Sequence, residues 1–194
     1  MNKYSILAIG LFVLNSCSNG SKKTNSPEEK QTAASFFPVT SFIKGQIIVL
    51  DSLPVTPLQI TTVKGKSDSI WITKEVMKKL LLPFLTPVIN ETNLIDFFTE
   101  TKFKDQTLNA ITFTYDPSQI MPDSISLRHW DVYVNPETGN VEKVYIVKTI
   151  KDQGQNLTQQ LTWQTNKLVK ITTILNKTNG DQELLKEVVF IWNF

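Results

Sequence analysis

The residues of this sequence that could support catalysis are its single histidine and an aspartate two positions further on. His129 and Asp131 lie in a β-rich run, so their side chains are expected on the same face of a strand. An aspartate can orient an imidazole as a general base, which makes a hydrolase one hypothesis. No nucleophile or metal ligand stands at a recognisable spacing from this pair, and a lone strand histidine is more often a surface or cross-strand residue. We therefore assign no catalytic residue and expect no cofactor.

The composition excludes several classes of site. The chain of 194 residues contains one Cys and one His, which excludes a disulfide framework and a Cys/His zinc site, so no metal is expected. Its 20 Lys and Arg stand against 18 Asp and Glu, a net charge of +2. Binding to nucleic acid phosphates requires a clustered basic excess, and the sequence has none. Nucleic acid is therefore not an expected partner.

The cysteine follows an apolar segment near the amino terminus. Lys3 precedes an eleven-residue apolar run at 4–14, and Asn15, Ser16 and Cys17 follow directly. This layout is that of a secretory signal peptide. As a helix the run would rise about 16 Å, roughly half of the hydrocarbon core of a bilayer, so it is too short for a permanent span. A plain signal peptide with an incidental thiol is one interpretation of this segment, and a buried helix with a core cysteine is another.

Residues 14–17 (LNSC) resemble the lipobox of bacterial lipoproteins. The resemblance implies diacylglycerol transfer to the Cys17 sulfur, cleavage before Cys17 and acylation of the new amino terminus, and two or three acyl chains anchor a protein stably. Ser18 is similar to the sorting signal for the outer membrane, and residues 18–23 lack the acidic cluster that sends some Bacteroidetes lipoproteins to the cell surface. The expected location is the outer membrane, with the protein facing the periplasm.

The segment after the cysteine is expected to be a tether. Residues 18–35 contain no large apolar side chain, so they cannot bury enough surface to offset the entropy of ordering. As a coil the segment would average roughly 23 Å end to end, and about 60 Å when stretched. We therefore divide the chain into a signal peptide (1–16), the lipidated Cys17 with a flexible tether (17–35), and a single domain (36–194).

The first half of the domain shows helical spacing. Apolar residues recur every three or four positions in 39–53, with Thr40 and Ser41 as cap candidates, although Gly45 and a β-branched run leave a strand possible. Thr73 is a good N-cap for a second helix, which a proline at 83 or 87 would bend or stop. A third short helix is expected from about residue 90 or 92, with Leu94, Ile95, Phe97 and Phe98 facing the core.

The second half of the domain changes to β-rich runs separated by turn residues, and such short connections allow only antiparallel neighbours. The fold class is therefore α+β, with a six-stranded antiparallel meander packed by two or three N-terminal helices. A separate hairpin is expected at 58–64 and 67–72 around Gly65. The six expected strands are 107–115, 124–134, 141–151, 156–165, 168–177 and 183–193.

The last expected strand is apolar on both faces. Val188, Phe190 and Trp192 point one way, while Val189 and Ile191 point the other. Such a strand is either central and covered on both sides or lines a groove. Because the last strand of a meander is expected at an edge, a helix, a curl of the sheet or a partner should cover it. A set of aromatic residues of the domain either fills the core, the commoner outcome, or lines a lipid or peptide groove. The set is Phe36, Phe37, Phe42, Phe97, Phe98, Trp163, Phe190 and Trp192.

Three serines stand in short motifs that resemble the acceptor for periplasmic O-glycosylation in Bacteroidetes. Ser52, Ser69 and Ser124 each follow an aspartate and precede an aliphatic residue. Glycans on these serines are one interpretation. The other is that Asp-Ser pairs mark helix caps and turns, where we expect all three.

The whole chain resembles the small uncharacterised lipoproteins of Bacteroidetes, and that resemblance implies no activity. We expect a non-enzymatic binding or scaffold module in the cell envelope, attached to the membrane through Cys17, whose partner is an envelope protein, a glycan or a lipid. One alternative is a carrier that holds a lipid in a groove of a curled sheet, similar to lipoprotein-carrier half barrels. The other is the hydrolase that uses His129 and Asp131.

Overall fold

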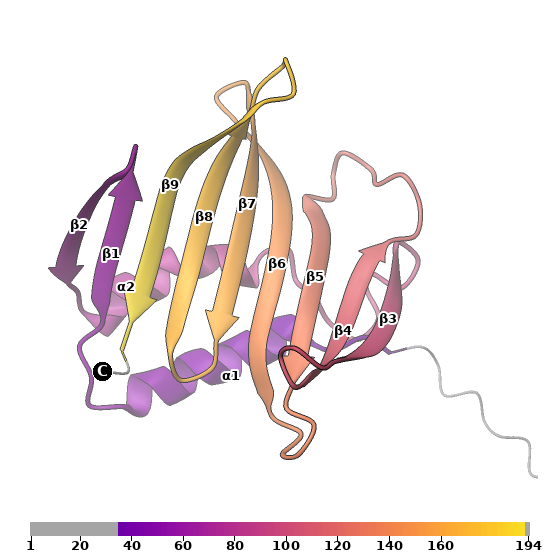
Figure 1. The fold of residues 1–194 in the computed structure, drawn as a ribbon, viewed down its shortest axis with the longest axis horizontal. Coiled ribbons are helices and arrows are strands. Elements are labelled where there is room, and N and C mark those ends of the chain that lie inside the picture. Colours follow the sequence, from indigo (N-terminus) through magenta and orange to yellow (C-terminus); the bar gives the residue numbers. More distant parts are fainter. Residues whose placement is uncertain (1–34, 193–194) are drawn as a thin grey trace, which may run out of the picture. The chain divides into compact units, whose positions relative to one another are not determined.

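The computed structural model describes residues 35–192, which form one antiparallel sheet with helices on one of its faces (Figure 1). The expected signal peptide, the lipidation site Cys17 and nearly all of the expected tether lie outside the described residues. In chain order the elements are α1 (Val39–Ser52), β1 (Leu58–Val63), β2 (Lys66–Trp71), α2 (Lys74–Leu80), the 3-10 turn η1 (Leu82–Leu85), β3 (Phe98–Asp105), β4 (Ala110–Pro117), β5 (Leu127–Val134), β6 (Val141–Asp152), β7 (Gln155–Gln164), β8 (Leu168–Asn176) and β9 (Gln182–Ile191).

The sheet has nine strands in the order β2-β1-β9-β8-β7-β6-β5-β4-β3. All six strands expected for the second half are present as β4 to β9, so the antiparallel meander and the α+β class are confirmed. The strand count was too low because the meander is extended at both ends. The early hairpin, β1 and β2, joins one end, and β3 joins the other. Strand β3 escaped prediction because only its first residue, Phe98, is buried, and its exposed lysines and threonines are typical of an edge.

Strand β9 is not an edge. Strand β1 pairs with it from Leu58 opposite Ile191 to Val63 opposite Lys186, so β9 is central in the sheet, one of the two alternatives, and the edge position typical of a last strand is not found. The β1–β2 hairpin covers this edge, instead of the expected helix, curl of the sheet or partner. The turn of that hairpin is formed by Lys64 and Gly65, with φ of 48° and 76°, the left-handed conformation that two-residue hairpin turns require.

Both expected N-terminal helices are present. Helix α1 begins at Val39 after Pro38, but Thr40 does not cap it, because Thr40 is buried and its Oγ1 accepts a hydrogen bond of 2.8 Å from the Ile89 backbone N–H. Thr73 does cap α2, since its Oγ1 accepts from the Val76 N–H at 3.3 Å. Within residues 35–192 no helix combines the length and the apolar character needed to span a bilayer.

The third expected helix does not form. The chain after Ile89 makes successive turns in which the Asn90 carboxamide oxygen accepts hydrogen bonds from the Thr92 and Asn93 N–H groups, at 3.0 and 2.8 Å. These side-chain contacts compete with helical hydrogen bonds, which explains the difference. Leu94 and Phe98 are nevertheless buried as expected, and Phe98 then begins β3.

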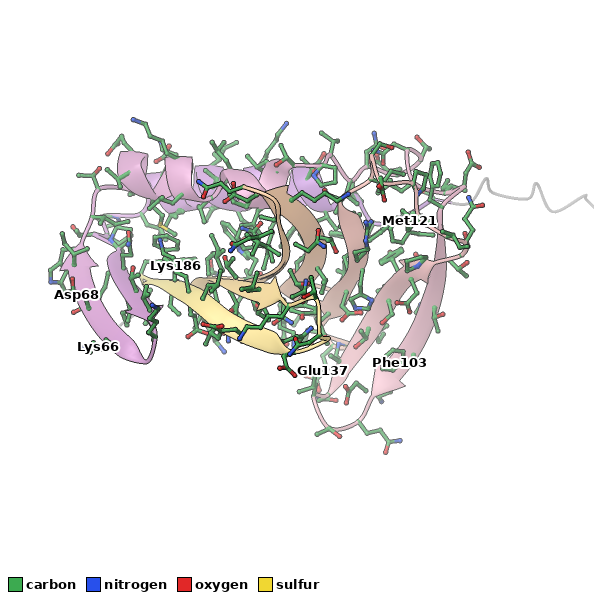
Figure 2. All side chains as sticks on the ribbon, turned by 90° about the horizontal axis from the view of Figure 1, so that it is seen from above. Lys66, Asp68, Phe103, Met121, Glu137 and Lys186 are labelled. Carbon is green, nitrogen blue, oxygen red and sulfur yellow. The ribbon has the colours of Figure 1, made fainter. Side chains whose placement is uncertain are left out.

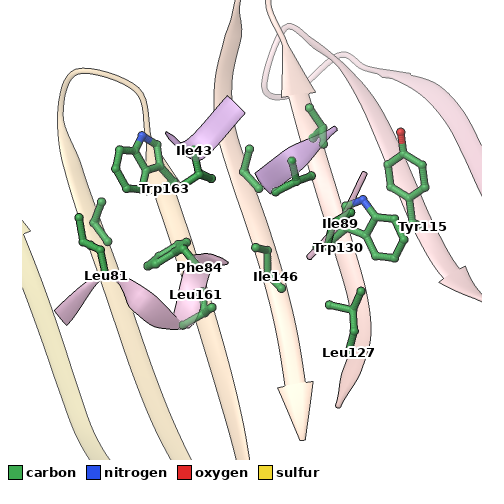
Figure 3. Packing of buried hydrophobic residues seen from close by; sticks show 14 of the residues in the cluster. Ile43, Leu81, Phe84, Ile89, Tyr115, Leu127, Trp130, Ile146, Leu161 and Trp163 are labelled. Atoms are coloured by element: carbon green, nitrogen blue, oxygen red, sulfur yellow. The ribbon is translucent and has the colours of Figure 1, made fainter. Parts of the chain in front are cut away.

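The core lies between the helices and the sheet (Figure 3). Trp130 stacks on Tyr115 with ring centroids 4.4 Å apart, and Trp163 packs edge-on against Phe84 at 5.7 Å. Five of the aromatic residues singled out from the sequence are buried and the other three are partly buried against them, which confirms that they form the core. The five are Phe36, Phe98, Trp163, Phe190 and Trp192, and the three are Phe37, Phe42 and Phe97.

The two faces of the sheet differ in cover. The helices lie along one face, and within residues 35–192 no helix lies along the other, which we call the open face (Figure 2). Side chains alternate between the two, so the buried Leu161 and Trp163 of β7 point to the helices while Thr162 and Gln164 point to the open face. Neighbouring strands in register therefore present a largely polar surface over β5 to β7, with Leu168 of β8 and Val189 of β9 adding apolar side chains beside it.

Candidate functional site

A groove of about 610 Å³ lies on the open face of the sheet, across strands β5 to β9. Its volume falls within the range of small-ligand sites. The residues come from alternate positions of each strand, and cross-strand pairing sets them side by side; Tyr145, for example, lies opposite Asp131 on one side and Thr162 on the other. The lining residues are Asp131, Tyr133, Lys143, Tyr145, Thr162, Gln164, Leu168, Lys170, Glu187 and Val189.

Two tyrosines and a lysine form the aromatic end of this groove. The Lys143 ammonium lies 3.6 Å from the centroid of the Tyr133 ring, a cation–π contact. Burial lowers the pKa of Lys143 although the charges of Asp131 and Asp105 oppose this, and among the described residues no carboxylate lies within salt-bridge distance of it. Burial also raises the pKa of Tyr145, with the nearby Asp131 charge adding to the shift. Lys143 is therefore a cation without a salt-bridge partner among the described residues, at the edge of a groove.

His129 lies on the same face, beside the groove, and contacts two carboxylates. Its Nδ1 is 2.8 Å from Asp116 Oδ1, and its Nε2 is 3.0 Å from Asp131 Oδ2. The hydrogen bond to Asp131 raises the pKa of His129 to about 9; burial opposes this and the bond to Asp116 adds to it. Burial alone would raise the pKa of Asp131, but hydrogen bonds from His129 and Thr114 outweigh it and leave this pKa below its ordinary value.

In this geometry both imidazole nitrogens of His129 are occupied by carboxylate contacts. A protonated imidazole donates from both nitrogens and has no lone pair with which to accept a proton, so His129 is poorly placed to act as a general base near neutral pH. The Thr114 hydroxyl, the nearest nucleophile type in the network, donates to Asp131 Oδ1 at 2.7 Å instead of to the histidine. Among the described residues no three His, Cys, Asp or Glu side chains are grouped so as to hold a metal ion.

A second hollow of about 610 Å³, which we call the end pocket, lies where the hairpin turns meet α1. Its residues include Phe42 and Gln46 of α1, Asn140 and Glu142 after the β5–β6 turn, and Asn166 of the β7–β8 turn. Tyr133, Lys143 and Gln164 line both the end pocket and the groove, so the two hollows adjoin at these three residues.

The turn beside the end pocket has the structure expected from its sequence. The Asn135 carboxamide oxygen accepts hydrogen bonds from the Glu137 and Thr138 N–H groups, at 2.9 and 3.0 Å. Gly139 has a φ of 71°, which favours glycine. These contacts fix the direction in which β6 leaves the turn, and hence the position of Lys143 at the junction of the two hollows.

The three candidate glycosylation serines are all exposed. Ser52 ends α1, where its Oγ donates to the Val49 carbonyl at 2.6 Å, and Ser124 lies in the connection before β5. Ser69 lies within β2, the edge strand, so its expected place at a turn was wrong. Each serine is accessible to a modifying enzyme, and the use of these motifs stays a prediction.

Sequence reasoning singled out His129 and Asp131 but missed the groove beside them. Tyr133 and Tyr145 occupy open-face positions of neighbouring strands, a pattern that becomes a site only once the strand register is known. The alternation of polar and aromatic residues in β5 and β6 is the one signal that could have suggested it. Comparisons with models of protein families, with curated proteins and with solved structures found no match for this chain.

Proposed function

We propose that the chain is a bacterial envelope lipoprotein, held at the outer membrane by acyl chains on Cys17, whose domain is a non-enzymatic binding module. The observation that carries the binding role is the groove on the open face. A structural sheet needs no hollow lined by two tyrosines and an unpaired lysine, whereas a ligand site needs convergent polar groups around a concave surface. In the groove the ligand would lie against β5 to β9, on the face opposite the helices.

The carrier of a hydrophobic ligand is the second candidate. It is favoured by β9, whose Val189 and Ile191 add apolar surface to the open face. The space between helices and sheet, where a half-barrel carrier would hold an acyl chain, is filled here by large rings such as Trp130, Trp163 and Phe84. The polar lining of the groove therefore favours a polar ligand over an acyl chain.

The membrane attachment is tested by mass spectrometry of the mature amino-terminal peptide from the chain expressed in a Gram-negative bacterium. We expect a peptide that begins at Cys17 and carries acyl chains, and a Cys17→Ala variant that leaves the membrane fraction. An unmodified thiol on a membrane-bound protein would contradict this part of the proposal.

The binding role is tested by photo-crosslinking in living cells. A photoreactive phenylalanine analogue replaces Tyr145 in the groove, and in a control variant replaces Ile48, which is 71% exposed on the outer side of α1. We expect an envelope component to be attached at position 145 and not at position 48. Equal labelling at both positions, or none at position 145, would remove the support for a binding groove.

A further inference from the structure

The unpaired cation at the junction of the two hollows indicates the charge of the ligand. The carboxylates that line the hollows already have partners: Asp131 binds His129, Glu187 lies 3.6 Å from Lys170, and the Glu142 carboxylate accepts from the Asn135 carboxamide at 2.8 Å. Lys143 contacts the face of Tyr133, and although the charges of Asp131 and Asp105 act on it from a distance, no carboxylate among the described residues forms a salt bridge with it. An anionic group on the ligand would complete this site with a charge-assisted hydrogen bond.

The other polar groups in the hollows indicate the chemistry of the rest of the ligand. The side chains of Tyr145, Thr162 and Gln164 form no hydrogen bond with another described residue, and they offer both donors and acceptors. Groups of this kind suit a ligand that carries many hydroxyls. The rings of Tyr133 and Tyr145 add aromatic surface against which the apolar side of a sugar ring can lie.

The position on a sheet face argues against an extended peptide. The backbone N–H and C=O groups of β5 to β8 are used in pairing with both neighbouring strands, so only side chains are available to a ligand there. Peptides that bind sheets usually add a strand to an edge and bond through their backbone. A glycan makes its hydrogen bonds through its own hydroxyls and needs no free strand.

From these three observations we infer that the joined hollows bind an acidic glycan, with a carboxylate of one sugar on the Lys143 ammonium and neighbouring sugars extending into the groove and the end pocket. This inference rests on the proposed binding function and names its ligand class. Lys143 lines both hollows, and each hollow extends away from it with further lining residues. The acidic sugar therefore lies within the glycan chain, with neighbouring sugars on both sides.

The test is calorimetric titration of the purified full chain with two sugar probes of equal length, hexagalacturonic acid and neutral maltohexaose, and with oligoglutamate as an acidic peptide. The variants are Lys143→Gln, Lys143→Arg and the control Lys186→Gln, which removes one exposed charge from β9 (Figure 2). We expect the acidic probe to bind at least tenfold more tightly than the neutral one, and Lys143→Gln to lose at least tenfold, the range for hydrogen bonds to charged groups. Lys143→Arg should keep most of the affinity and Lys186→Gln all of it. Circular dichroism of each variant confirms the fold.

Each of the following results would overturn the inference. Equal binding of both probes, unchanged in Lys143→Gln, would show a glycan site without charge selection, which overturns the inference and leaves the binding function intact. Stronger binding of oligoglutamate than of hexagalacturonic acid would replace the glycan with an acidic peptide. Binding of neither sugar would also overturn the ligand class, while the crosslinking at position 145 separately decides whether the groove binds anything.

Discussion

The Nε2 of His129 lies 3.0 Å from Oδ2 of Asp131, on a face of the sheet that the helices leave uncovered. Asp131 is only 8% exposed, so its charge is carried into a poorly solvated position and needs the imidazolium as its counterion. The pair links β5 to β4 through the second contact of the histidine, to Asp116. In the structure His129 and these two aspartates form a charged cross-strand link beside the groove.

This link predicts a pH dependence of stability. The pKa of His129 in the folded chain, about 9, lies above the ordinary 6.5, so its stabilising contribution is complete below pH 6.5 and is lost as the pH rises through 9. We expect the free energy of unfolding of the wild type, relative to His129→Gln, to fall by up to about 3 kcal/mol across this window. Urea unfolding of both proteins from pH 6 to 9.5 measures this difference in unfolding free energy. A difference that stays constant with pH would refute the stabilising role of the link.

The burial of Lys148 predicts a pH dependence of stability opposite in sign to that of His129. Its ammonium is buried on the helix face and donates to the carbonyls of Pro83 and Thr86 at 2.6 and 2.8 Å. Burial lowers its pKa to about 8, below the ordinary 10.5, so the unfolded chain binds the proton more tightly and stability rises with pH between 8 and 10.5.

The comparison for Lys148 is a Lys148→Met variant, unfolded in urea at pH 7.5 and at pH 10.5. We expect the wild type to gain stability relative to the variant at the higher pH. Because the window of His129 overlaps that of Lys148 with the opposite sign, only the difference between each variant and the wild type is informative. A gain of the same size in both proteins would show that Lys148 does not titrate in this range.

Gly45 is a site where a larger residue is expected to stabilise the domain. It lies inside α1, is exposed, and a Cβ there would meet no atom within 4 Å. Gly45→Ala should raise the free energy of unfolding by about 0.5–1 kcal/mol, because alanine has the higher helix propensity. Gly139→Ala, at a φ of 71°, should lower it by about 1 kcal/mol. Urea midpoints with unchanged slopes measure both effects, and equal shifts in the two variants would contradict the argument.

The core should be most sensitive at Trp163. This side chain is 1% exposed and touches the rings of Phe84 and Trp192. Trp163→Ala should cost about 3–5 kcal/mol of unfolding free energy, because the helix layer cannot collapse into a hollow of that size. Phe103→Ala, on the edge strand β3 and 46% exposed, should cost much less. Similar losses in the two variants would contradict the assignment of the core.

The fold was largely predictable because its strongest signals are local. Thr73 caps its helix, and the alternation of Leu157, Leu161 and Trp163 correctly assigns one face of β7 to the core. The prediction missed strand β3 because an edge strand buries few side chains and so shows no apolar alternation in its sequence. The helix expected near Asn90 failed because its asparagine side chains bond to the nearby backbone in a turn, which apolar spacing does not reveal.

The candidate site was not predictable for a different reason. Tyr133, Lys143 and Gln164 are 31 positions apart at most and belong to three strands, and their proximity depends on the register of two strand pairings. A one-residue slip in either pairing would move a side chain to the helix face. The charge state of His129 likewise depends on Asp116, thirteen positions away in β4, which the sequence gives no reason to connect with it.

The pairing of β1 with β9 limits the order in which the strands of the sheet can form during synthesis of the chain. Residues 58–63 can find their partner only after residues 186–191 have been made, and contacts so far apart in sequence form slowly. Until those residues have been made, the β1–β2 hairpin lacks the strand that joins it to the rest of the sheet. The nine-stranded sheet can therefore be completed only after its carboxyl-terminal strand has been synthesised.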